Sequence, residues 1–280
     1  MDREGRSPGF YLLAVFFALF VLFLYGPIST IVILSFQGPD GGLTFPMNGM
    51  STYWFVNLFE KQAVGDFGGS FSRSIRLGLV VMATTLVVSV SAGLAFRRPF
   101  RGSTVLFYLA IASLIVPSIL VSLGIGLMFN ILKWDTNWYG SALGAHLTWT
   151  LPFGLLIMFA VFNRFNKAYE EAARDLGATP AQTFRHVVLP IIAPSLIGVA
   201  LFGFTLSYDE FARSLMTSGS FNTLPLEIYG MTTNVTTPVL YALGTLTTGF
   251  SLMVVLLCLA ASLVLQRRRR RHGSDAGRGI

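Results

Sequence analysis

Residues 10–36 read FYLLAVFFALFVLFLYGPISTIVILSF, a stretch without a single Asp, Glu, Lys or Arg. A helix needs about 20 consecutive apolar residues to cross a hydrocarbon core roughly 30 Å thick, and this stretch is longer than that. It also exceeds the apolar region of a signal peptide, and no small-residue cleavage site follows it. We therefore expect it to be retained as a membrane anchor.

Five further stretches of the chain have the same character. The predicted spans are about 10–36, 75–96, 105–132, 142–162, 187–206 and 240–265. Overall, 53% of the 280 residues are hydrophobic and 12% are charged, about half the charged fraction of a soluble domain. The runs lack the period-two alternation of membrane β-strands, and a helix satisfies its own backbone in lipid. The sequence predicts an all-α polytopic membrane protein with six transmembrane helices.

The positive charge of the chain gathers in the segments between and beyond these spans. Segments 1–9, 97–104, 163–186 and 266–280 hold 15 of the 20 Lys and Arg residues. The positive-inside rule places such segments in the cytoplasm. We expect a cytoplasmic N-terminus (1–9), a six-helix permease-like domain (10–265) and a basic cytoplasmic tail (266–280). Because the net charge of +7 maps onto loops beside the membrane, it does not indicate a nucleic-acid partner.

Several kinds of chemistry have no motif in this chain. No lysine follows a glycine, so the G-x-x-x-x-G-K-[ST] nucleotide loop is missing. Neither a His/Cys cluster for a metal nor a G-x-S-x-G nucleophile elbow is found. We expect no catalytic residue, cofactor or metal here. An ion-coupled carrier is disfavoured because the predicted spans contain no Asp or Glu, although sodium can also bind backbone carbonyls. A non-transporting scaffold remains an alternative.

The loop at 163–186 is charged, yet it has the pattern of two helices. The first is predicted over 167–176, with Asn166 as its N-cap and Gly177 just beyond its end. A second begins at a capping box starting at Thr179 and runs into the fifth span. Ala168, Ala172 and Leu176 recur at helical spacing and indicate a contact face. Spacing alone leaves open whether that face docks on a partner or packs on the chain's own loops or on lipid headgroups.

One pattern in this loop resembles a known family. Residues 171–190 read E-A-A-x3-G-x9-V-x-L-P, which resembles the EAA loop of permease subunits in binding-protein-dependent ABC importers, with Val187 in place of the family's Ile. The resemblance covers roughly 75–265 and implies a type I ABC importer permease fold. It further implies that the residues coupling the chain to a separate ATPase are Glu171, Ala172, Ala173, Leu176, Gly177, Leu189 and Pro190.

Two other segments are similar to spermidine/putrescine permeases, specifically to the second of the two permease subunits. They are FTLSYDEF at 204–211 and LPLEIYGM at 224–231. The resemblance implies polyamine import, with another small organic solute or ion as the alternative cargo. Tyr208, Asp209 and Glu210 follow the fifth span on the outer side and are candidates for the substrate path or an outer gate. The alternative for the two acids is that they are solvated and cap a short helix.

The resemblance also implies the partners of the chain. We expect two ABC ATPase subunits that bind ATP, a second permease subunit, and a periplasmic or lipid-anchored solute-binding protein. The small-molecule substrate and membrane lipid complete the set. Segments 37–74 and 207–239 are the candidates for docking the binding protein. The expected location is the bacterial inner membrane, with both termini in the cytoplasm.

Overall fold

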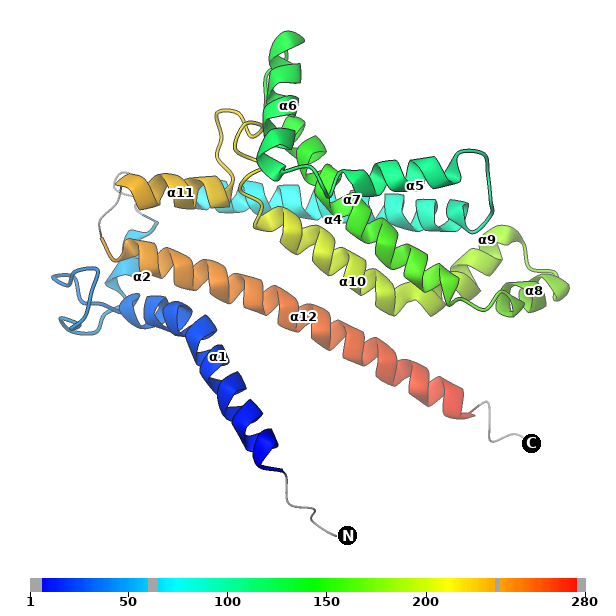
Figure 1. Ribbon diagram of the computed structural model, residues 1–280, viewed down its shortest axis with the longest axis horizontal. Helices are drawn as coiled ribbons and strands as arrows, with labels where there is room; N and C mark the ends of the chain where they lie inside the picture. Colours follow the sequence, from blue (N-terminus) through cyan, green and yellow to red (C-terminus); the bar gives the residue numbers. More distant parts are fainter. Residues whose placement is uncertain (1–6, 60–64, 235–236, 276–280) are drawn as a thin grey trace. The chain divides into compact units, whose positions relative to one another are not determined.

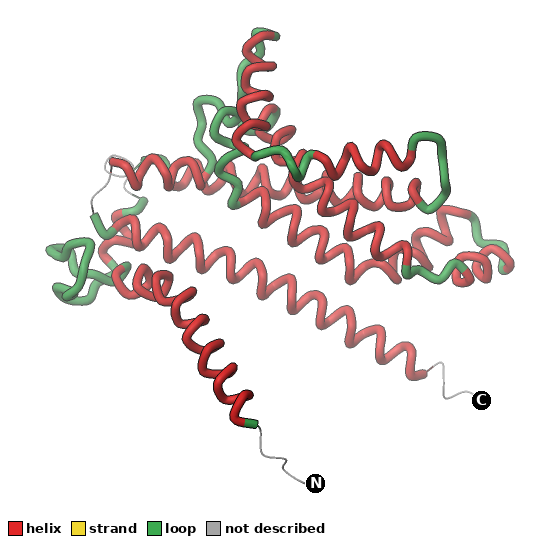
Figure 2. The backbone as a smooth tube through the Cα atoms, viewed as in Figure 1, coloured by secondary structure: helices red, strands yellow, loops and turns green. Residues whose placement is uncertain are grey.

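The structure is a computed structural model that describes residues 7–59, 65–234 and 237–275, with side chains described up to residue 264. Apart from an isolated bridge between Gln37 and Met50, the regular elements in these residues are helices (Figures 1 and 2). The predicted N-terminus (1–6), the end of the predicted tail (276–280) and the side chains of its arginines lie outside the described residues.

Five helical segments are long and apolar enough to cross a membrane: Pro8–Leu34, Phe67–Phe96, Ser141–Asn163, Pro180–Tyr208 and Val239–Val264. They coincide with five of the predicted spans. The helices that form them are α1 (Pro8–Leu34), α4 (Phe67–Phe96), α7 (Ser141–Asn163), α10 (Leu189–Tyr208) with the shorter α9 and η1 before it, and α12 (Val239–Asp275). Helix α4 begins earlier than the predicted residue 75, and α12 continues beyond the predicted residue 265.

The predicted third span, 105–132, is formed by two helices rather than by one continuous helix. The stretch forms α5 (Ser103–Ala112) and α6 (Ser118–Ile131), and Figure 1 shows α6 turning away from the direction of α5. Pro117 lacks a backbone N–H and disfavours helical geometry at the residue before it. At 1.5 Å per residue the two helices are only about 15 and 21 Å long. In the break, Ser113 Oγ donates to the Thr148 carbonyl of α7 at 2.8 Å.

The chain divides into two compact units, Met1–Phe67 with Ile228–Phe250 and Gly68–Glu227 with Ser251–Ile280. The first contains α1 and the short α2 (Tyr53–Asn57). Its loop after α1 is organised around buried Gln37, whose side chain donates to the Gly42 carbonyl at 3.1 Å and accepts from the Asn48 N–H at 2.8 Å. One amide side chain thus supplies partners to backbone groups on both arms of the loop.

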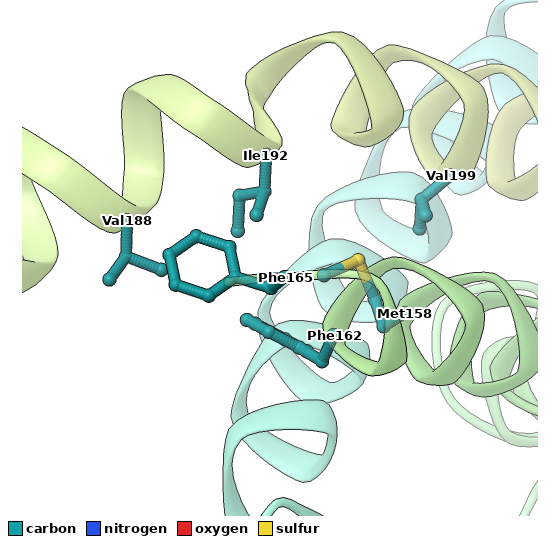
Figure 3. Packing of buried hydrophobic residues seen from close by; sticks show 6 residues of the cluster. All are labelled: Met158, Phe162, Phe165, Val188, Ile192 and Val199. Carbon is teal, nitrogen blue, oxygen red and sulfur yellow. The ribbon is translucent and has the colours of Figure 1, made fainter. Parts of the chain in front are cut away.

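The core of the second unit lies where α7 packs against α10 and η1. Its buried cluster consists of Met158, Phe162, Phe165, Val188, Ile192 and Val199 (Figure 3). Gly93 on α4 allows that helix to approach α7 closely. A Cβ added to Gly93 would lie 2.9 Å from the Phe162 ring and 3.0 Å from the Met158 Cβ. The buried hydroxyls of Thr85 and Thr150, 2.8 Å apart, link α4 to α7.

Gly93→Ala is therefore expected to destabilise the fold. The new methyl group must displace a packed ring, which costs about 1–3 kcal/mol of unfolding free energy. Gly249→Ala is the matched control, because a Cβ at Gly249 meets nothing within 4 Å. Thermal unfolding of the purified protein in detergent measures both. Equal melting temperatures for the two variants would contradict the close approach at Gly93.

Candidate functional site

The charged loop at 163–186 forms the predicted short helix, α8 (Ala168–Asp175). Its formal N-cap is Lys167, one residue later than predicted, although the Asn166 side chain still accepts from the Ala168 N–H at 3.0 Å. Acidic residues in the first turn and Arg174 in the last turn complement the helix dipole. Gly177 ends the helix with φ +83°, a conformation that side chains disfavour. The predicted glycine stop is confirmed.

One face of α8 is open to solvent in this chain. Ala168, Ala172 and Leu176 are all exposed, and Leu176 has 89% of its surface accessible. Glu171 is also exposed, whereas Ala173 is half-buried. An exposed apolar stripe on a charged helix favours a docking surface over a helix packed on its own loops.

The other side of α8 is tied to the spans by an ion pair. Arg97 follows α4, and its Nη1 and Nη2 donate to the two carboxylate oxygens of Glu170 at 2.7 and 2.9 Å. Both side chains are 13% exposed. The guanidinium lies over the rings of Phe162 and Phe165, at 5.3 and 5.1 Å from their centroids. The hydrogen bonds from Arg97 hold the pKa of the Glu170 carboxyl below its ordinary value.

A cavity of about 620 Å³ opens beside this pair. Its walls come from the end of α4, from α8, from α9 (Pro180–Thr183) and from η1 (Phe184–Val188). The ionisable side chains lining it are Arg97, Arg98, Lys167, Glu170, Glu171 and Arg174. Basic groups outnumber acidic ones, so the cavity surface is cationic. The space also means that α8 is held to the spans by particular contacts rather than by continuous packing.

The helix that leads into the next span contains an irregular turn. The predicted capping box at its start is present, with the Thr179 N–H donating to Gln182 Oε1 at 2.8 Å and the Gln182 N–H donating to Thr179 Oγ1 at 3.3 Å. In the π-helical η1, the Leu189 N–H bonds the Phe184 carbonyl, five residues back. Pro190 has no N–H and its ring excludes a normal turn, which a π-bulge accommodates. Leu189 and Pro190 of the EAA-like pattern therefore lie at this π-bulge.

The three residues selected from sequence for the substrate path or outer gate lie in different surroundings. Tyr208 is buried, and its ring stacks on Phe204 with 5.7 Å between centroids. Asp209 is exposed at the end of α10. Glu210 is engaged by Arg213, whose backbone N–H donates to Oε1 at 3.0 Å and whose Nη1 lies 3.6 Å from Oε2. Of the three, only Asp209 presents a carboxylate to solvent.

Arg213 is the residue of this region that sequence reasoning missed. Its side chain is fully buried. Its Nη1 donates to Ser118 Oγ at 2.6 Å, its Nε donates to Thr148 Oγ1 at 3.2 Å, and its guanidinium lies 4.6 Å from the Trp149 centroid. Ser118 begins α6, so Arg213 joins the broken helix to α7 and to the loop after α10. The sequence feature that could have indicated this ion pair is the spacing of Glu210 and Arg213, which are three residues apart.

A buried histidine fastens the same loop. The ring nitrogens of His146, in α7, lie 2.8 Å from Ser207 Oγ and 2.9 Å from Ser214 Oγ. Ser122 Oγ of α6 accepts from the Met216 N–H at 2.9 Å. The loop after α10 is therefore held against α6 and α7 by polar groups, which are costly to bury unless they are paired in this way.

Comparisons with known proteins agree with this architecture. Residues 85–272 match the family model of the binding-protein-dependent transport system inner membrane component. The chain is 29% identical over 249 residues to the spermidine/putrescine transport system permease protein PotC of Haemophilus influenzae, covering 89% of this chain and 95% of that protein. It is 30% identical over 233 residues to the putrescine transport system permease protein PotI of Escherichia coli K12, with 81% and 82% covered.

Solved structures show the same fold. A chain of a bacterial ABC transporter involved in the import of the acidic polysaccharide alginate superposes with a TM-score of 0.66 at 17% identity, covering 97% of this chain and 99% of that one. A chain of the MetNI methionine ABC transporter gives a TM-score of 0.54 at 16% identity, with 71% and 95% covered. This likeness shows the fold of a type I ABC importer permease.

Arg213→Met should destabilise the region where α6, α7 and the loop after α10 meet. Removing one partner of a buried ion pair costs about 3–5 kcal/mol because the other charge is left uncompensated. The double variant Arg213→Met with Glu210→Gln should lose less, since no lone charge remains. Exposed Arg76→Met is the control and should stay within about 0.5 kcal/mol of the parent. Thermal unfolding in detergent gives all three values; an R213M protein as stable as R76M would refute the buried pair.

Proposed function

Because this chain belongs to the family of binding-protein-dependent transport system inner membrane components, we propose that it forms half of the translocation path of a polyamine importer. It is a multi-pass inner membrane permease subunit of an ABC importer, and ATP is hydrolysed on a separate chain. The observation that carries the proposal is the exposed apolar face of α8 within an EAA-type loop. Near full-length similarity to permeases named for spermidine and putrescine supports the choice of cargo.

Coupling would proceed through α8. Ala172 and Ala173 let a partner surface approach closely, Leu176 fills an apolar recess, and Glu171 faces the partner as a charge. Gly177 allows the chain to turn away immediately beyond this contact. When two ATPase subunits close on ATP, they would carry α8 with them. Leu189 and Pro190 lie at the π-bulge through which the same displacement would enter α10.

The remaining parts of the assembly follow from the path itself. Two permease subunits are needed to enclose a route for the solute, so a second permease of similar fold is expected. A periplasmic or lipid-anchored binding protein would deliver the cargo to the outer loops within 37–74 and 207–239. The basic segments place both termini in the cytoplasm. ATP belongs to the partner ATPase, and we assign no cofactor to this chain.

Asp209 is the residue through which a cationic cargo would first be attracted. Its carboxylate is exposed at the end of α10, whereas Glu210 is neutralised by Arg213. Tyr208, buried against Phe204, would line the path only after the outer end opens. The fold alone does not determine the cargo, because chains of the same fold belong to a transporter involved in alginate import and to a methionine ABC transporter.

The docking role of α8 predicts the loss of a partner. Gly177→Asp puts a side chain where φ is +83°, and Glu171→Lys reverses a charge on the exposed face. Each should release the ATPase from the detergent-solubilised complex, measured by co-purification through a tag on the permease. Arg185→Gln, exposed on η1, is the control and should retain the ATPase. Retained ATPase and normal transport in both test variants would refute this docking surface.

The cargo proposal predicts uptake of labelled putrescine and spermidine by cells expressing the whole system. Asp209→Asn should lower putrescine uptake several-fold at limiting concentration, and the loss should shrink at high ionic strength because it is electrostatic. Asp135→Asn, another exposed acid of the outer loops, is the matched control. Equal uptake by the two variants would remove Asp209 from the path, and no uptake of either polyamine by the parent would contradict the cargo.

A further inference from the structure

Helix α8 has a second attachment that lies outside the EAA pattern. We propose that Arg97 is a positioning residue that clamps α8 to the membrane spans, so that motion of α8 driven by nucleotide reaches α4 and α7. The clamp consists of Arg97, Glu170, Phe162 and Phe165. It deepens the proposed function and rests on it, because it assigns the residue through which the coupling helix acts on the rest of the permease.

The two adjacent acids of α8 differ in their contacts. Both line the cavity beside the ion pair, but Glu171 is exposed, whereas Glu170 is bonded to Arg97 and its side chain is only 13% exposed. The apolar stripe of Ala168, Ala172 and Leu176 is exposed as well. One face of α8 is therefore free for a partner while the other is already bonded to its own chain. A helix that transmits motion from a partner to the membrane spans needs a contact with each of them.

The geometry of the clamp makes it stiff. Two parallel N–H···O bonds fix the plane of the guanidinium as well as its position. The rings of Phe162 and Phe165 lie beneath that plane and add cation–π attraction. A lysine at this position would keep the charge but would offer only a point contact.

The clamp is continuous with the core of the second unit. Phe162 ends the buried part of α7, and Figure 3 shows the Phe165 ring beside Val188 and Ile192, with Phe162 in the same cluster. Displacing Glu170 therefore moves Arg97, which follows α4 and lies over two rings of this core. Close packing of this kind transmits displacement rather than absorbing it. A cationic cavity lies beside the clamp.

The test uses the complete complex with its ATPase and compares Arg97→Met, Glu170→Met and the double variant. Putrescine uptake per ATP hydrolysed should fall at least tenfold in each single variant while the ATPase still co-purifies. The double variant should fall no further, because the two residues act through each other. Arg98→Met is the control: it lines the same cavity, and within the described part of the chain it has no ion pair. An unchanged ratio in R97M, or single effects that multiply in the double variant, would overturn the clamp.

A second measurement does not depend on which solute is moved. Hydrogen exchange of the α8 amides should rise at least tenfold in R97M and in the milder Arg97→Lys, while the amides of 188–199 keep the parent rate. Unchanged exchange in α8 would show that Arg97 does not hold this helix. Equal increases in both regions would assign Arg97 to folding alone. Either result would overturn the proposal. A parent complex without ATPase would instead contradict the proposed function, and the exchange comparison on the permease would still decide the clamp.

Discussion

The ion pair between Arg97 and Glu170 joins a helix outside the membrane to the helices that cross it. Glu170 belongs to α8, whose opposite face is exposed, and Arg97 stands at the end of α4 over rings that belong to the buried core. Without this ion pair, α8 would be a short helix with a loop at each end, beside an open cavity. A helix of 8 residues has little stability of its own, so its position depends on what holds it.

The same device occurs near the other end of α7. Arg213 pairs with Glu210 over the ring of Trp149, just as Arg97 pairs with Glu170 over Phe162. Both rings project from α7, which therefore carries a clamped arginine toward each end. Arg97 holds α8, and Arg213 holds the start of α6 after the break in the predicted third span. Helix α7 therefore contacts both clamped arginines, through Phe162 and Trp149.

Local patterns in the sequence predicted a large part of this arrangement. Long apolar runs gave five helices at nearly their observed positions, and the Thr179 capping box and Gly177 gave the ends of the loop helices. The separation of the third span into two helices was not predicted, because composition remains apolar through Pro117 and a proline within a membrane helix is often tolerated. Neither clamp was predicted. Although the Glu210–Arg213 pair is local, the other contacts of the two clamps join residues far apart in the sequence, such as Arg97 with Glu170 and Arg213 with Thr148. No local pattern reports such a contact.

The proposed function depends on which molecule covers the exposed face of α8. A photo-activatable amino acid at position 172, in membranes that contain the complete system, would capture the neighbour of that face for identification by mass spectrometry. The account predicts a crosslink to a nucleotide-binding ATPase subunit, at a yield that changes when ATP is added. Crosslinks only to lipid or to this chain's own loops would contradict it.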